Sequence, residues 1–142
     1  MDEGTIFLIV WTIAVVLILS KLYIIGKKAL SIFPDINTVQ VVYRDKSASG
    51  NSTQSWKTKM GGAKNVLDIV VTDKELWIKS MLLFAGIGKR YDLLHKVSLN
   101  NIKGVNPKGK KITIDFKTED GEDKQVVIIT KRPDDFMKAI NN

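Results

Sequence analysis

The feature that most constrains this chain is an apolar stretch over residues 5–25, whose only charge, Lys21, lies one turn from its end. As an α-helix it would be roughly 31 Å long at about 1.5 Å per residue, which matches a hydrocarbon core of about 30 Å. A cleaved signal peptide needs a positive start, whereas this chain starts with Asp2 and Glu3 after its Met. A buried core helix would need apolar partners all round, and the other apolar runs are short. The sequence therefore predicts one retained transmembrane helix.

Charges on either side of this stretch predict its orientation. Asp2 and Glu3 precede it, Lys21 lies near its end, and Lys27 and Lys28 follow it. Positive flanks tend to stay in the cytoplasm, so we expect the N-terminus outside and the C-terminal part in the cytoplasm. The three lysines are expected to contact lipid headgroups. The predicted location is the cell membrane, with a single pass.

Composition divides the chain into three parts. Residues 1–28 are the anchor with its basic flank, residues 29–38 a juxtamembrane connector, and residues 39–142 one soluble domain. The net charge of +7 suits an anionic membrane surface, and no arginine-rich stripe points to nucleic acid, so no nucleic-acid partner is expected. The chain has no cysteine, which excludes a disulfide, a thiolate nucleophile and Cys-ligated zinc.

The first half of the soluble domain contains one clear hairpin. Residues 66–71 and 76–79 are apolar runs joined by turn-forming residues, the pattern of two antiparallel strands. Residues 39–43 have the β-branched and aromatic content of a strand, whereas the polar run 44–55 is expected to be a mobile loop. Residues 56–60 are expected to form another short strand.

Residues 81–87, Met-Leu-Leu-Phe-Ala-Gly-Ile, allow two interpretations. A core strand is favoured, because an apolar run of this length in a small β domain is usually a strand. Exposed, the run would instead be an interaction patch able to enter a bilayer interface or bind a partner, and Lys89 and Arg90 would contact headgroups. The glycine pairs at 61–62 and within 86–89 are expected to form turns. The candidate patch consists of Leu82, Leu83 and Phe84.

Strand patterns continue in the second half of the domain. Residues 91–94 are expected to form a strand, 97–105 an irregular strand or corner, and 106–109 a turn. Ile112, Ile114 and Phe116 alternate with polar residues, so these three should face the core in a strand that pairs with residues 125–130.

The last element is predicted to be an amphipathic helix. Pro133 suits a helix start, and Asp134 and Asp135 suit its first turn, where the helix dipole favours acids. Phe136 and Ile140 recur at helical spacing and should dock on the sheet. The predicted fold class is mainly β, with about seven strands and one C-terminal helix, preceded by a single transmembrane α-helix.

This order of elements carries a resemblance. The run Leu76-Trp77-Ile78 after a turn, the later run 96–105, the paired strands and the terminal helix together resemble bacterial PH-like and GRAM-like domains. The resemblance covers roughly residues 39–140 and implies a PH-like barrel. Its motifs are hydrophobic spacing patterns rather than chemical signatures. It implies core positions for Leu99, Ile102 and Val105.

Residue types that carry chemistry are sparse. The single histidine, His95, has no second histidine and no cysteine to complete a metal set. The carboxylates within residues 119–123 crowd one turn without the spaced ligands of a calcium loop. No Gly-x-Ser-x-Gly elbow is present. We therefore expect no catalytic residues, no metal and no cofactor.

Basic side chains gather around the predicted turn at residues 106–109. The resemblance implies that such loops can contact a lipid surface, and the residues concerned are Lys108, Lys110 and Lys111. A dedicated phosphate pocket is not favoured, because bidentate phosphate recognition uses arginine and the chain has only Arg44, Arg90 and Arg132.

These observations predict a membrane-anchored binding or scaffolding module in a membrane protein complex. Its expected partners are membrane lipids and a protein. The alternative is a direct sensor of anionic lipid headgroups, which would act through the basic loops.

Overall fold

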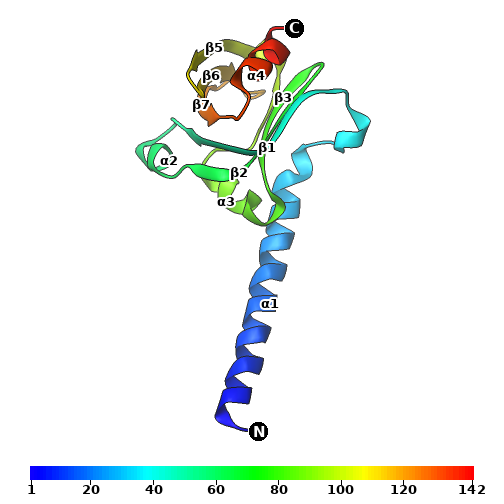
Figure 1. Cartoon of the computed structure of the whole chain (residues 1–142), viewed down its shortest axis with the longest axis vertical. Coiled ribbons are helices and arrows are strands. Elements are labelled where there is room, and N and C mark those ends of the chain that lie inside the picture. Colours follow the sequence, from blue (N-terminus) through cyan, green and yellow to red (C-terminus); the bar gives the residue numbers. More distant parts are fainter.

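The computed structural model describes the backbone of residues 1–142 and every side chain except that of Lys57. It contains a long N-terminal helix, a seven-stranded antiparallel sheet and a C-terminal helix (Figure 1). In chain order the elements are α1 (Glu3–Ala29), the 3₁₀ turns η1 (Leu30–Ile32) and η2 (Ile36–Thr38), β1 (Val41–Ser52), α2 (Trp56–Met60), β2 (Ala63–Thr72), β3 (Glu75–Ser80), η3 (Leu82–Phe84), α3 (Ala85–Arg90), β4 (His95–Ser98), η4 (Leu99–Asn101), β5 (Ile102–Lys108), β6 (Lys111–Lys117), β7 (Asp123–Ile129) and α4 (Pro133–Asn141).

Helix α1 extends away from the sheet domain as one rod (Figure 1). Asp2 caps it by accepting a hydrogen bond from the Thr5 N–H at 2.8 Å, and Glu3 lies in its first turn, where the helix dipole favours an acid. Its apolar side chains are exposed, including Trp11 at 58%. The helix is long and apolar enough to cross a membrane.

The sheet has the strand order β4-β3-β2-β1-β7-β6-β5, with every neighbouring pair antiparallel. Strand β1 is the longest, and it pairs with β2 on one side and, near its end, with β7 on the other. Register shifts within β1 interrupt its ladder with β2, a feature that increases local bending and twist. The sheet is not closed into the barrel that the resemblance implies. It stays open, with β4 and β5 as its edges, although only η4 separates these two strands in the chain.

The core lies between the inner face of the sheet and α4. Ile112, Ile114 and Phe116 are fully buried, as the alternation in β6 predicts. Phe136 of α4 is fully buried and meets the Tyr43 ring edge-on, with the ring centroids 5.5 Å apart. The predicted hairpin is confirmed as β2 and β3, and the predicted terminal helix is confirmed as α4.

The predicted mobile loop at residues 44–55 is wrong, because β1 continues to Ser52. Its polar side chains have partners on other strands and segments. Arg44 donates to both carboxylate oxygens of Asp68 at 3.0 and 2.7 Å, and the Asp45 carboxylate accepts from Thr130 at 2.9 Å. Strand pairing on both sides therefore outweighs a composition that is typical of a loop.

Two further strand predictions are wrong. Residues 56–60 form the short helix α2, in which the Ser55 hydroxyl accepts from the Thr58 N–H at 3.2 Å while the Thr58 hydroxyl accepts from the Ser55 N–H at 2.8 Å. Residues 91–94 form a turn, with Asp92 in the left-handed region at φ 56°. Strand β4 begins only at His95.

The turn predicted at residues 106–109 is shorter than expected. Strand β5 continues through Pro107 to Lys108, and the chain reverses at Gly109, whose φ is +63°. Pro107 lies in an edge strand, which is the place in a sheet where proline is tolerated.

The core strand favoured for residues 81–87 is also wrong. The segment forms η3 and the start of α3, and the turn expected at residues 86–89 lies within α3. Four of its apolar side chains are partly exposed: Met81 at 45%, Leu83 at 40%, Phe84 at 45% and Ile87 at 48%. The alternative interpretation, an exposed apolar patch, fits this arrangement.

Candidate functional site

The junction between α1 and the sheet domain is built on two glycines. Gly26 in the last turns of α1 is buried, and a Cβ at this position would lie 1.8 Å from the carbonyl oxygen of Leu82. A Cβ at Gly86 would lie 2.6 Å from the Cγ2 atom of Ile25. Glycine at position 26 lets the two backbones approach this closely, and glycine at position 86 leaves room for the Ile25 side chain. The end of α1 therefore packs directly on η3 and α3, as Figure 1 shows.

The connector after α1 adds a second attachment. Phe33 packs on Trp77 of β3, with the ring centroids 6.0 Å apart, and Trp77 is fully buried. The ammonium group of Lys79 lies 5.9 Å from the Phe33 ring centroid and 5.6 Å from that of Trp77, within the range of a cation–π interaction. The segment between α1 and β1 is thus packed on the outer face of the sheet. The packing of Gly26 on Leu82 and that of Phe33 on Trp77 together fix how α1 is set relative to the domain.

An exposed apolar surface surrounds this junction. We call Met81, Leu83, Phe84 and Ile87 the junction patch. Leu82, which was predicted to belong to an exposed patch, has its backbone against Gly26 and is only partly exposed. Lys89 and Arg90 follow in the last turn of α3 and are exposed.

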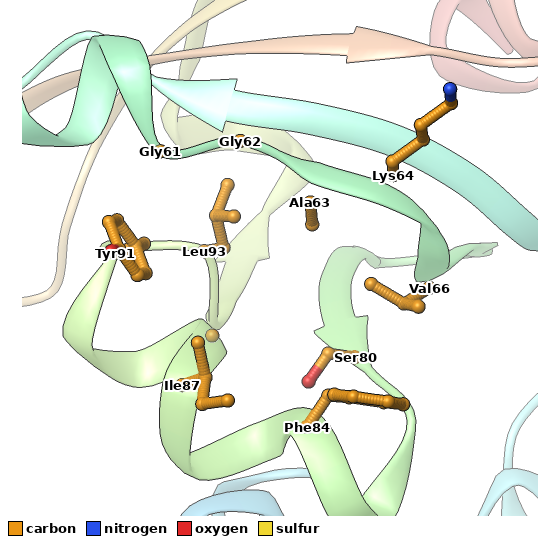
Figure 2. Close-up of a pocket in the computed structure, with 11 residues that line it drawn as sticks. Gly61, Gly62, Ala63, Lys64, Val66, Ser80, Phe84, Ile87, Tyr91 and Leu93 are labelled. Carbon is orange, nitrogen blue, oxygen red and sulfur yellow. The ribbon is translucent and has the colours of Figure 1, made fainter.

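A pocket of about 320 Å³ lies beside the junction patch (Figure 2). We call it the junction pocket. Its walls are the turn at residues 61–62 with the start of β2, the end of β3, the helices η3 and α3, and the segment of residues 91–93. Gly61 lets the turn pack on the Tyr91 ring, because a Cβ there would lie 2.1 Å from a ring carbon. Phe84 and Ile87 belong both to the pocket wall and to the junction patch.

The predicted lipid-contact residues fall into two groups. Lys21, Lys27 and Lys28 are exposed on α1, and Lys89 and Arg90 are exposed on α3 beside it. The other group belongs to strands β5 and β6 and their connecting turn, which lie at the end of the domain away from α1 in Figure 1. This second group consists of Lys108, Lys110 and Lys111, all exposed.

A polar network around Asp92, in the turn before β4, involves the single histidine. Asp92 accepts from Ser52 at 2.8 Å and from Lys124 at 2.6 Å, and His95 donates through Nε2 to the Asp92 carbonyl oxygen at 2.7 Å. Burial raises the pKa of Asp92, but hydrogen bonds from His95, Lys124 and Ser52 outweigh it and lower the pKa to about 2. His95 also packs edge-on against Phe116 with the ring centroids 5.0 Å apart, so the network has a structural role.

Among the described residues, no group of three or more His, Cys, Asp and Glu side chains is placed to hold a metal ion. At the acidic turn, Asp123 pairs with Lys103 at 2.5 Å instead. Comparison with protein-family models gives no match, and comparison with curated proteins gives none.

Sequence reasoning missed the glycines of the junction and the pocket beside it. Gly26 carries one local signal, because it lies between the end of the apolar stretch and the two lysines Lys27 and Lys28. Its partner, Leu82, lies far along the chain, and no local pattern identifies it.

Proposed function

We propose that this protein is a single-pass membrane protein whose PH-like domain is a binding or scaffolding module of a membrane complex. In this proposal α1 spans the cell membrane, the N-terminus lies outside, and the sheet domain lies in the cytoplasm. The domain is held at the bilayer surface in one orientation.

The observation that carries the proposal is the packing of α1 on η3 and α3. Gly86 lies against Ile25, the last residue of the predicted span. The helix α3 is therefore level with the place where α1 leaves the hydrocarbon. At that level, exposed apolar side chains such as Ile87 lie in the interface, and Lys89 and Arg90 meet the headgroups.

The element order supports a PH-like domain. Seven antiparallel strands are followed by a helix that packs on the core through Phe136, which is the order on which the resemblance rests. Leu99, Ile102 and Val105 pack against the core as partly buried residues, which fits the positions that the resemblance implies.

The position of the basic residues favours a binding module over a headgroup sensor. A sensor would act through the lysines of the β5–β6 hairpin, yet these strands lie at the end of the domain away from α1 (Figure 1). Electrostatic attraction to a bilayer falls off within a Debye length, about 8 Å at physiological ionic strength. A surface remote from the bilayer is better placed to meet a protein partner.

Cysteine labelling in intact cells tests the topology. The natural chain has no cysteine, so Asp2→Cys and Asp120→Cys each provide a single reactive site. A membrane-impermeant maleimide should label position 2 in intact cells and position 120 only after permeabilisation. Labelling of both positions from the same side would contradict a single span.

Depth measurements in nanodiscs test the fixed orientation. A nitroxide on Ile87→Cys should show the oxygen accessibility of the membrane interface, whereas a nitroxide on Lys108→Cys should show that of water. Equal, water-like accessibility at both positions would contradict the docked arrangement.

Purification in a mild detergent tests the binding function. The full chain should be recovered with a protein partner at fixed stoichiometry. A lone chain that binds vesicles of one anionic lipid, but not vesicles of equal charge made from another, would favour the headgroup sensor instead.

A further inference from the structure

The junction pocket is an apolar space beside the end of α1. Figure 2 shows Leu93, Ile87 and Phe84 around it, and the hydroxyl of Ser80 turned toward it. Lys64 also lines the pocket, but its ammonium group points away (Figure 2). The described lining residues therefore suit an apolar ligand rather than a phosphate or a carboxylate.

We propose that the junction pocket takes an acyl chain of a bilayer phospholipid. This inference rests on the proposed function, because it requires α1 to span the membrane. At about 320 Å³ the pocket is at the small end of ordinary ligand sites, which span about 300–1,000 Å³. It has room for part of one chain and not for a whole two-chain lipid.

Continuity between the pocket and the junction patch gives the chain a path. Phe84 and Ile87 line the pocket and are also 45% and 48% exposed. With α3 at the level where α1 leaves the hydrocarbon, an acyl chain passes from the bilayer into the pocket along apolar side chains. Lys89 and Arg90 lie beside this path and pair with the phosphate of the same lipid.

The chemistry of the lining favours an acyl chain over a peptide. A peptide segment would bring backbone N–H and C=O groups into the pocket, and each of these needs a hydrogen-bond partner. The Ser80 hydroxyl already donates to the Met81 carbonyl oxygen, at 3.4 Å, so it is not free to donate to a peptide. An acyl chain has no such groups and matches the apolar walls at no polar cost.

Photo-crosslinking in nanodiscs tests the proposal with the full chain. The nanodiscs contain phosphatidylcholine and phosphatidylglycerol with a trace of phosphatidylcholine that carries a diazirine on one acyl chain. After illumination, mass spectrometry should find lipid adducts on α1 and also on residues 61–66 and 91–93. Adducts on α1 alone would overturn the acyl-chain site and leave the span intact. Absence of adducts on α1 would overturn the proposed span itself.

Two substitutions that fill the pocket test whether the lipid lies inside it or only touches its rim. Ala63→Trp and Val66→Phe each place a larger side chain in the space seen in Figure 2. Either should abolish the adducts on residues 91–93 while those on α1 persist. The matched control is Val42→Trp, at an exposed position of β1, which should leave all adducts unchanged. Adducts on residues 91–93 that persist in both folded variants would show that the lipid only touches the surface, and would overturn the proposal.

A crosslinker on the protein provides an independent measurement. Photoactivatable p-benzoylphenylalanine at Tyr91, which is already an aromatic residue of the pocket wall, should yield a phospholipid adduct in native membranes. A crosslinked polypeptide in place of lipid would overturn the acyl-chain assignment.

Discussion

The junction region and the β6–β7–α4 region use apolar residues in opposite ways. In β6 and α4 the apolar side chains Ile112, Phe116 and Phe136 are fully buried by the chain's own folding. At the junction, residues of equal apolarity such as Phe84 and Ile87 remain almost half exposed, and the close contacts are made at glycines. The first region is completed by the protein alone. The second leaves apolar surface that a bilayer would cover.

The largest expected effect tests the self-contained region. Phe136→Ala should lower the free energy of unfolding by about 3 to 5 kcal/mol, because it removes a fully buried aromatic ring and leaves a cavity. Lys117→Ala, at an exposed position of β6, should cost about 0.5 kcal/mol or less. Denaturant titration of the full chain in detergent measures both. Equal losses would contradict the assigned faces of β6 and α4.

The next effect concerns the polar network around Asp92. Its pKa is lowered to about 2 from an ordinary value of 3.8, so the network stabilises the fold above about pH 4 and loses that contribution as the pH falls toward 2. The contribution is about 2 kcal/mol. Asp92→Asn keeps a residue type that tolerates the left-handed backbone and should remove most of this pH dependence.

Asp73→Asn provides the control for that measurement. Asp73 is exposed in the turn between β2 and β3, so its substitution should leave the dependence of stability on pH unchanged. An unchanged acid transition in Asp92→Asn would show that other carboxylates cause it.

The third prediction tests whether the packing of α1 on η3 can be disrupted without unfolding the sheet domain. Gly26→Val should push η3 away from α1, since even a Cβ at this position meets the Leu82 carbonyl oxygen. A nitroxide at position 87 should then become water-accessible, while the unfolding free energy of the sheet domain changes by about 1 kcal/mol or less. Gly4→Val is the matched control, because nothing lies within 4 Å of a Cβ there. Loss of the whole fold in Gly26→Val alone would mean that junction and core are one cooperative unit.

Local patterns were sufficient to predict the self-contained region and insufficient for the junction. The alternation of β6 and the helical spacing of α4 are complete within a few residues, so β6, β7 and α4 were predicted correctly. The loop predicted after Tyr43 is wrong, because the polar residues of β1 have distant partners such as Asp68 and Thr130. The strand predicted for residues 81–87 is wrong because the structure of this segment depends on contact with α1, which no local pattern shows.

The candidate site was predictable only in part. Lys89 and Arg90 lie beside the apolar segment simply because they follow it in the chain, and their contact with headgroups stays a prediction. The two groups of basic residues could not be separated, since only the sheet topology places β5 and β6 away from α1. The junction pocket combines four separate segments, and its walls have the ordinary apolar residues of a core.

The smallest expected effect compares the two basic groups. Near a bilayer, each basic side chain contributes about 1 kcal/mol of attraction to anionic lipid, and the attraction vanishes over a few Debye lengths. Adding phosphatidylglycerol to nanodiscs should therefore draw a nitroxide at position 87 deeper, and the double change Lys89→Gln with Arg90→Gln should remove that shift. The triple change to Gln at Lys108, Lys110 and Lys111 should leave the shift unchanged, because these residues lie on the strands away from α1. High salt should reduce the shift in the natural chain and have no effect in the double variant. If the triple variant lost the shift and the double variant kept it, the bilayer would face the β5–β6 hairpin, and the contrast between a self-contained region and a lipid-covered junction would be reversed.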